Sequence, residues 1–143
     1  MELKELAEKA DEEASMTLSI LILEDEPEVR HALERDLRPF ADRFRIEAAE
    51  TYEDAWDVVE EIVDSDDQLA LVLSDHRLPG RDGVDFLISV TNDDRVADAK
   101  KILVTGQAYL DDCVRAVNNA HLDYYVAKPW DPDQQCEVVR ELL

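Results

Sequence analysis

Short apolar runs alternate with longer amphipathic stretches along almost the whole chain. The apolar runs predict five strands, at residues 17–23, 43–48, 69–74, 101–105 and 123–127. The first and third runs are almost wholly apolar, which is typical of strands buried on both faces of a parallel sheet. Apolar residues at helical spacing follow each strand and predict helices at about residues 27–37, 51–63, 84–91, 111–120 and 131–143. This alternation predicts an α/β fold, a parallel sheet with helices on both faces.

Local signals indicate where these helices begin and end. Pro27 lies where a proline suits the first turn of a helix, and Pro39 is expected to end that helix. Thr51 and Asp111 are expected N-caps, because a short polar side chain there accepts a bond from a free backbone N–H. The helix after Asp111 is expected to have one apolar side, formed by Val114, Val117 and Ala120.

Residues 2–14 predict a further helix outside this repeating pattern, with leucines and alanines along one stripe. The expected organisation is therefore a helical extension over residues 1–15 and one domain over residues 16–143. A chain of 143 residues suits a single domain of this kind.

Charge restricts the classes of partner. The chain has 36 acidic and 15 basic side chains, a formal net charge of −21, which excludes a basic nucleic-acid-binding face and disfavours anionic lipid. No apolar run approaches the roughly 20 residues that span a bilayer, and the charged N-terminus has no signal-peptide core, so a cytoplasmic protein is expected. The acid excess fits a solvated acidic surface or adaptation to high salt, and composition leaves both open.

The spacing of the cysteines and histidines predicts neither a zinc site nor a disulfide framework. Cys113 and Cys136 are far apart and are expected to be buried, reduced thiols. Three histidines lack zinc-ligand spacing and are expected at the surface or its boundary, namely His31, His76 and His121.

Chemically active side chains stand where the predicted strands end. Glu24 and Asp25 follow the first strand, Asp75 follows the third, Thr105 ends the fourth and Lys128 ends the fifth. The carboxyl ends of parallel strands face one crevice, so these groups are expected to converge. Carboxylates about 4 Å apart repel by about 4 kcal/mol per pair at a protein-like dielectric, which calls for a cation such as Mg²⁺. A nucleophilic carboxylate, a metal site, a lysine and a hydroxyl together suit phosphoryl transfer onto a carboxylate.

Four motifs that carry these residues occur in an ordered series. They are Leu-Ile-Leu-Glu24-Asp25-Glu26-Pro27, Leu-Ser-Asp75-His-Arg-Leu-Pro79-Gly-Arg-Asp-Gly83, Leu-Val-Thr105-Gly-Gln107 and Ala-Lys128-Pro129-Trp130. In their order and spacing they resemble the receiver domain of two-component response regulators, over about residues 17–143. The resemblance implies a flavodoxin-like, doubly wound five-stranded parallel sheet of order 2-1-3-4-5.

The resemblance also implies a role for each motif residue. Asp75 would accept the phosphoryl group, and Asp25 would bind Mg²⁺ directly. Glu24 would act mainly through water, and the backbone carbonyl of Arg77 would complete the protein ligands. Lys128 would pair with the phosphoryl group.

Further roles concern switching and the lifetime of the phosphorylated state. Thr105 would hydrogen-bond the phosphoryl group, and Tyr125 stands at the family's switch-aromatic position. Arg77 and Gln107 stand at the two positions that modulate dephosphorylation. The surface formed by the helix after Thr105, the strand at 123–127 and the last helix would change on phosphorylation and be read by partners.

The expected function is a phosphorylation-activated receiver that takes its phosphoryl group from a histidine kinase or phosphotransfer protein. Output would go through a protein effector or a fused output domain, with homodimerisation as a further option. No enzymatic activity is expected beyond self-phosphorylation and self-dephosphorylation. One alternative is a non-phosphorylated interaction or dimerisation module. An aspartyl-phosphate phosphatase is less supported, because Arg77 stands where a general acid would be needed.

Overall fold

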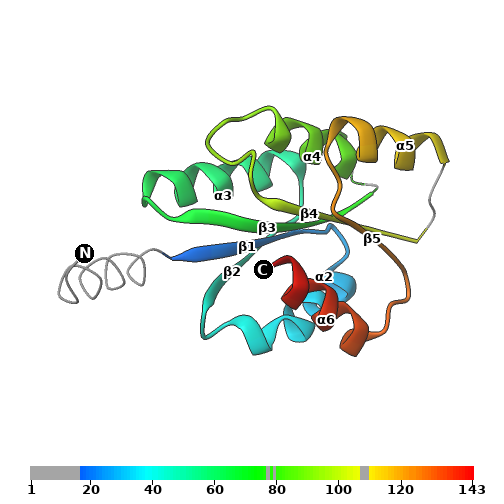
Figure 1. Ribbon diagram of the computed structural model, residues 1–143, viewed down its shortest axis with the longest axis horizontal. Coiled ribbons are helices and arrows are strands. Elements are labelled where there is room, and N and C mark those ends of the chain that lie inside the picture. Colours follow the sequence, from blue (N-terminus) through cyan, green and yellow to red (C-terminus); the bar gives the residue numbers. More distant parts are fainter. Residues whose placement is uncertain (1–16, 77, 79, 107–109) are drawn as a thin grey trace, which may run out of the picture.

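The computed structural model describes residues 17–76, 78, 80–106 and 110–143, with residues 110–113 described by their backbone alone (Figure 1). It contains one sheet of five parallel strands in the order β2-β1-β3-β4-β5, which confirms the predicted order. The strands are β1 (Leu18–Leu23), β2 (Phe44–Ala49), β3 (Gln68–Asp75), β4 (Lys100–Thr105) and β5 (Tyr124–Ala127). The predicted extension over residues 1–15 lies outside the described residues.

Helices cover both faces of this sheet, as the alternating pattern predicts (Figure 1). The helices are α2 (Pro27–Asp36), the short 3-10 helix η1 (Arg38–Phe40), α3 (Tyr52–Asp64), α4 (Gly83–Thr91), α5 (Leu110–Asn119) and α6 (Pro132–Leu142). One core lies between the sheet and α3, α4 and α5, and the other lies between the sheet and α2 and α6. None of the described helices is long and apolar enough to cross a membrane.

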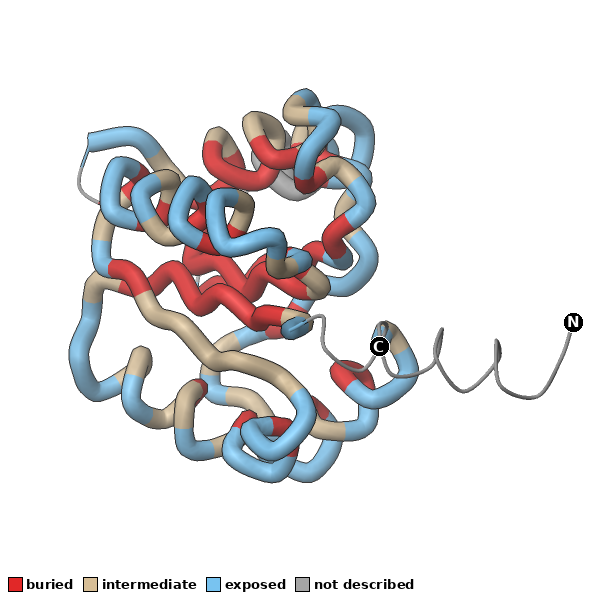
Figure 2. The backbone as a smooth tube through the Cα atoms, turned by 90° about the vertical axis from the view of Figure 1, so that its left-hand side faces the viewer, coloured by how far each residue is buried: buried red, intermediate tan, exposed pale blue. Residues whose placement is uncertain are grey.

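The central strands are buried because each contributes side chains to both cores. In β1, Leu21 and Leu23 belong to the core under α3–α5, whereas Ile20 and Ile22 belong to the core under α2 and α6. Successive side chains of a strand point to opposite faces, so an unbroken apolar run fills both cores. Figure 2 shows the resulting buried layer through the middle of the molecule.

The expected helix boundaries are confirmed in part. Pro27 is the first residue of α2, and the Thr51 hydroxyl accepts a hydrogen bond from the Asp54 N–H at 3.1 Å, as an N-cap does. The cap expected at Asp111 is wrong, because α5 begins one residue earlier and includes Asp111 in its first turn. Pro39 lies within η1, which follows directly on the end of α2.

The expected apolar side of α5 is only partly buried. Ala120 is buried together with Ala116, but Val114 is 48% exposed and Val117 is 58% exposed. The small alanine side chains, four positions apart, form the contact with the core, and the larger valines face outwards. Apolar residues at helical spacing therefore indicate the helix correctly but not which of its apolar stripes faces the core.

The thiol of Cys136 also differs from the expectation of full burial. Cys136 is a free thiol and only half-buried, and its Sγ donates a hydrogen bond to the Asp36 carbonyl at 3.1 Å. The side chain of Cys113 lies outside the described part of the structure.

A glycine allows α4 to begin directly behind the end of β3. The Gly83 N–H donates to the His76 carbonyl at 3.0 Å. A Cβ atom at this position would lie 1.5 Å from the Asp75 carbonyl oxygen and 2.5 Å from Ser74 Oγ. Only a hydrogen atom fits there, so the absence of a side chain at Gly83 fixes the approach of α4 to the strand that carries Asp75.

We therefore expect Gly83→Ala to lower the free energy of unfolding by about 2–4 kcal/mol, because backbone atoms must move to admit the methyl group. Gly106→Ala is the matched control, since the nearest atom to its Cβ would be 3.8 Å away, and we expect a change within about 0.5 kcal/mol. Urea denaturation of both variants measures the difference. Equal stability of the two variants would contradict the steric explanation.

Candidate functional site

The carboxyl ends of four strands bring the expected residues to one edge of the sheet. Glu24 directly follows β1, Asp75 is the last residue of β3, Thr105 is the last residue of β4, and Lys128 directly follows β5. Strand β1 lies between β2 and β3, so the strand order reverses here, and the crevice outside such a reversal is the usual ligand site of an open α/β sheet.

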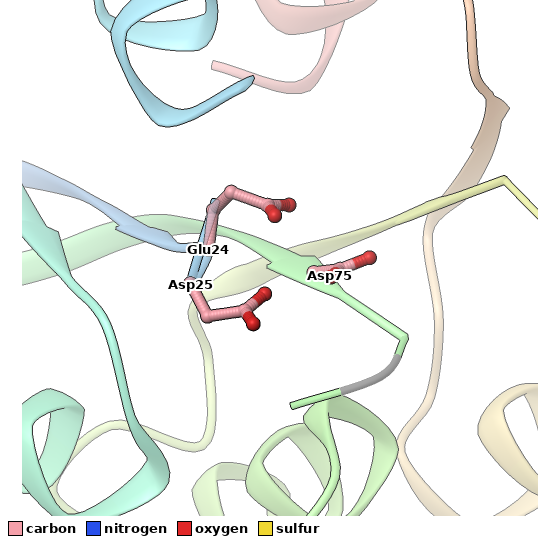
Figure 3. Close-up of side chains that lie close together, drawn as sticks. All are labelled: Glu24, Asp25 and Asp75. Carbon is pink, nitrogen blue, oxygen red and sulfur yellow. The ribbon is translucent and has the colours of Figure 1, made fainter. Parts of the chain in front are cut away.

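Three carboxylates form a compact acidic cluster at this edge. One oxygen from each of Glu24, Asp25 and Asp75 lies within 4.8 Å of the others, and their side chains extend into the same space (Figure 3). Glu24 and Asp75 are buried, whereas Asp25 is half-buried. Oxygen atoms of this kind are the ligands that a hard divalent cation prefers, so the cluster fits Mg²⁺.

Lys128 provides a positive charge against this cluster. Its Nζ donates hydrogen bonds to Glu24 Oε2 and to Asp75 Oδ1, each at 3.2 Å. Its backbone N–H donates to the Thr105 carbonyl at 2.8 Å, which fixes the lysine to the end of β4. One ammonium therefore contacts two of the three carboxylates and offsets part of their repulsion.

The local backbone holds the two buried carboxylates in place. The Glu26 N–H donates to Glu24 Oε1 at 3.2 Å, and the His76 N–H donates to Asp75 Oδ1 at 2.9 Å. The Arg30 guanidinium donates to the Glu24 carbonyl at 3.2 Å, so the first turns of α2 also fix this segment.

The crowding of negative charge is visible in the acidity of these groups. The pKa of Glu24 is raised from 4.5 to about 7, mainly by burial and next by the charge of Asp75, while the charge and hydrogen bond of Lys128 act to lower it. Burial acts to lower the pKa of Lys128, but Asp75 and Glu24 outweigh that effect, and the pKa is raised above its ordinary value. The site thus keeps its lysine charged and resists a third negative charge.

Thr105 is buried beside a residue that the sequence pattern missed. Its Oγ1 lies 3.5 Å from His76 Nδ1, and both side chains are buried. The surface or boundary position expected for His76 is therefore wrong, whereas His31 and His121 are exposed as expected. The burial of His76 could have been predicted from its position, because a residue directly after the last residue of a central strand remains close to the core.

Of the other expected site residues, the structure describes Tyr125 alone. Tyr125 lies in β5 with 40% of its surface exposed, so its ring is on the outside of the sheet edge in this structure. Arg77 and Gln107, including the backbone carbonyl of Arg77, lie outside the described residues.

Comparison with other sequences identifies the family. The sequence profile of the response regulator receiver domain matches residues 20–140. The chain is 30% identical over 126 residues to the response regulator Rre1 of Synechocystis sp., covering 88% of this chain and 52% of that protein. It is 32% identical to the hydrogenase transcriptional regulatory protein HoxA of Bradyrhizobium diazoefficiens, covering 87% of this chain and 24% of that protein. The chain thus spans about half the length of the first relative and a quarter of the second.

Solved structures agree with this match. A CheY-like response regulator receiver domain protein from Methanospirillum hungatei JF-1 superposes with a TM-score of 0.74 at 28% identity, over 89% of this chain and 93% of that chain. The receiver domain of a DNA-binding response regulator from Colwellia psychrerythraea 34H shares the fold, with a TM-score of 0.76 at 23% identity over 87% of this chain and 97% of that chain. The chain belongs to the response regulator receiver domain family.

Proposed function

We propose that this chain is a phosphorylation-activated receiver, with Asp75 as its phosphoacceptor and residues 16–143 as the receiver domain. The observation that carries the proposal is the contact of the Lys128 ammonium with Asp75 and Glu24, at 3.2 Å each, inside an acidic cluster. A group of like charges that repel one another is costly for a scaffold to keep, and it suits a site that binds a metal and a phosphoryl group. The histidine kinase or phosphotransfer protein of a two-component system would be the phosphodonor.

Receiver domains of this family bind Mg²⁺ at an acidic pocket. In this chain Asp25 and Asp75 would hold the ion directly, Glu24 mainly through water, and the carbonyl of Arg77 would complete the protein ligands. The bound ion would neutralise the carboxylates and the charge of the incoming phosphoryl oxygens.

The remaining steps use the chain's own groups. A carboxylate oxygen of Asp75 would attack phosphorus as the P–N bond to the donor histidine breaks, and the histidine nitrogen keeps the electron pair. Two hydrogen bonds from described residues, those of the His76 N–H and the Lys128 ammonium, end on Asp75 Oδ1 and hold this carboxylate in place. Lys128 would then donate to the transferred phosphoryl group, as would the Thr105 hydroxyl. Arg77 and Gln107 would influence the rate at which water removes that group.

Output would use the face formed by α5, β5 and α6. Of the five large apolar side chains that are exposed in the described part of the chain, four lie on α5 and β5: Val114, Val117, Tyr124 and Tyr125. A receiver needs an apolar surface that partners can bind, and movement of Thr105 and Tyr125 on phosphorylation would alter this one. The partner would be a protein effector, a fused output domain or a second copy of the chain.

Phosphorylation can be tested directly by intact mass. After incubation with acetyl phosphate and Mg²⁺, we expect the wild-type protein to gain about 80 Da, one phosphoryl group, and Asp75→Asn to gain nothing. Chelation of Mg²⁺ with EDTA should also prevent the gain, because the carboxylates would then repel the phosphoryl oxygens.

Asp57→Asn, at an exposed position on α3, is the matched control and should gain the same mass as the wild type. An equal gain in Asp75→Asn would exclude Asp75 as the acceptor. The absence of any gain in the wild type would instead favour the non-phosphorylated interaction module.

The raised pKa of Glu24 predicts a pH dependence for the metal-free protein. Because the folded state holds this proton up to about pH 7 and an ordinary carboxyl releases it near 4.5, ionisation should cost up to about 3 kcal/mol of stability as the pH rises between these values. We expect Glu24→Gln to equal the wild type near pH 5 and to exceed it in stability at pH 8, as measured by urea denaturation in EDTA.

With Mg²⁺ present we expect the opposite order of stability at pH 8, with the wild type more stable than Glu24→Gln. A cation competes with the proton of Glu24, so the stabilisation of the wild type by Mg²⁺ should increase from pH 6 to pH 8, and Glu24→Gln should show a smaller increase. Glu137→Gln, at an exposed position on α6, serves as the control for loss of one charge. A stability difference between Glu24→Gln and the wild type that is the same at pH 5 and pH 8 would contradict the prediction.

A further inference from the structure

A groove of about 290 Å³ lies along β5 and α6, next to the proposed site. Its walls are formed by β5, by residues 129–131 and by the side chains of Gln134, Gln135 and Val138 on α6. One wall is fixed in place, because Trp130 Nε1 donates a hydrogen bond to Asp36 Oδ2 on α2 at 2.7 Å.

The groove contains a buried amide that has no hydrogen-bond partner in the described part of the chain. Gln135 is 2% exposed, and neither its Nε2 nor its Oε1 has a hydrogen-bond partner among the described residues. Buried amide groups are almost always paired, because an unpaired donor or acceptor loses its bonds to water without replacement. A side-chain amide offers one acceptor and a donor side by side, which matches the C=O and N–H of a peptide group.

The strand beside this amide has an open edge. Within the described sheet β5 pairs with β4 on one side only, and Figure 1 shows it at the margin of the sheet. In a parallel ladder alternate residues direct their N–H and C=O groups to opposite sides, so half of these groups in β5 point away from β4. The strand itself is only partly covered, since Tyr124 and Tyr125 are 39% and 40% exposed.

The negative charge of the chain favours a basic partner segment in this groove over an acidic one. Asp131 is the one charged residue among those that line the groove, and the chain as a whole has a net charge of −21. A second copy of this chain would bring another −21 to the contact, whereas a basic segment would be attracted.

We propose that the β5–α6 groove binds an extended, basic segment of a partner protein, which adds as a strand to the free edge of β5 and pairs its backbone with the Gln135 amide. This inference specifies which kind of segment binds to the output face, and its role in signalling rests on the proposed function. The exposed side chains of Tyr124 and Gln134 form the rim, and their rotation would give the segment access to the buried amide. An extended segment fits better than a helix, because a helix has already paired its own backbone groups and offers none to β5 or Gln135.

The test uses two synthetic peptides and the unphosphorylated full chain. The probe is an octapeptide of alternating lysine and valine, and the control has the same sequence with alternate backbone nitrogens methylated. Both have the same charge and side chains, but the control cannot form the hydrogen bonds of an added strand. By isothermal titration calorimetry in 0.3 M NaCl, we expect the methylated peptide to bind at least tenfold more weakly.

Two variants test the role of the amide. We expect Gln135→Leu to raise the melting temperature, because it removes an unpaired buried amide, and to weaken binding of the unmethylated probe at least fivefold. Gln134→Leu makes the same chemical change at the exposed rim and should alter the affinity less than twofold. If Gln135→Leu does not fold, the two peptides still give the test on the wild-type protein.

Several results would overturn the inference. Equal binding of the two peptides would show attraction by charge alone, and no binding of either would exclude the groove as a site for such a segment. Unchanged affinity in Gln135→Leu would exclude the amide as a contact. The peptide experiment uses the unphosphorylated protein and needs no phosphodonor, so the phosphorylation experiment and the peptide experiment can fail separately.

Discussion

The structure depends on the convergence of three carboxylates that would repel one another in the absence of a compensating charge. Two of them are buried, and the Lys128 ammonium hydrogen-bonds to both. The sheet makes this arrangement unavoidable, because residues that follow neighbouring parallel strands meet at one edge. Because one ammonium does not balance three carboxylates, the same geometry that costs folding free energy provides a reason to bind a divalent cation such as Mg²⁺.

The fold and the residues of the acidic edge were predictable from sequence because they depend on strong, local patterns. An apolar run such as β1, with Ile20 and Leu21 facing different cores, has few stable environments other than a central parallel strand. The positions of Glu24, Asp75 and Lys128 follow from the strand ends alone. The distances between these side chains and their pKa values do not follow from the strand ends. The raised pKa of Glu24, for example, depends on burial and on neighbours far away in the sequence.

The sequence pattern could not predict which of several similar side chains would be buried and which exposed. Val114 and Val117 form an apolar stripe, but the neighbouring stripe of small residues, including Ala116, faces the core. His76 has a residue type found equally at surfaces and interiors, and only its place after β3 buries it. The Gln135 amide, for which the described residues provide no hydrogen-bond partner, is buried by the packing of α6 against an edge strand, and no sequence pattern encodes this burial.

Under the proposed function, the position of Lys128 in the chain also determines how far a signal would have to travel. Its two neighbours, Ala127 and Pro129, line the groove beside α6, while its own ammonium contacts Asp75. The acidic edge and the groove are thus adjacent along the backbone, one residue apart. Communication between them would need no relay through the protein interior, because a displacement of the Lys128 backbone would act directly on the groove wall that Ala127 and Pro129 form.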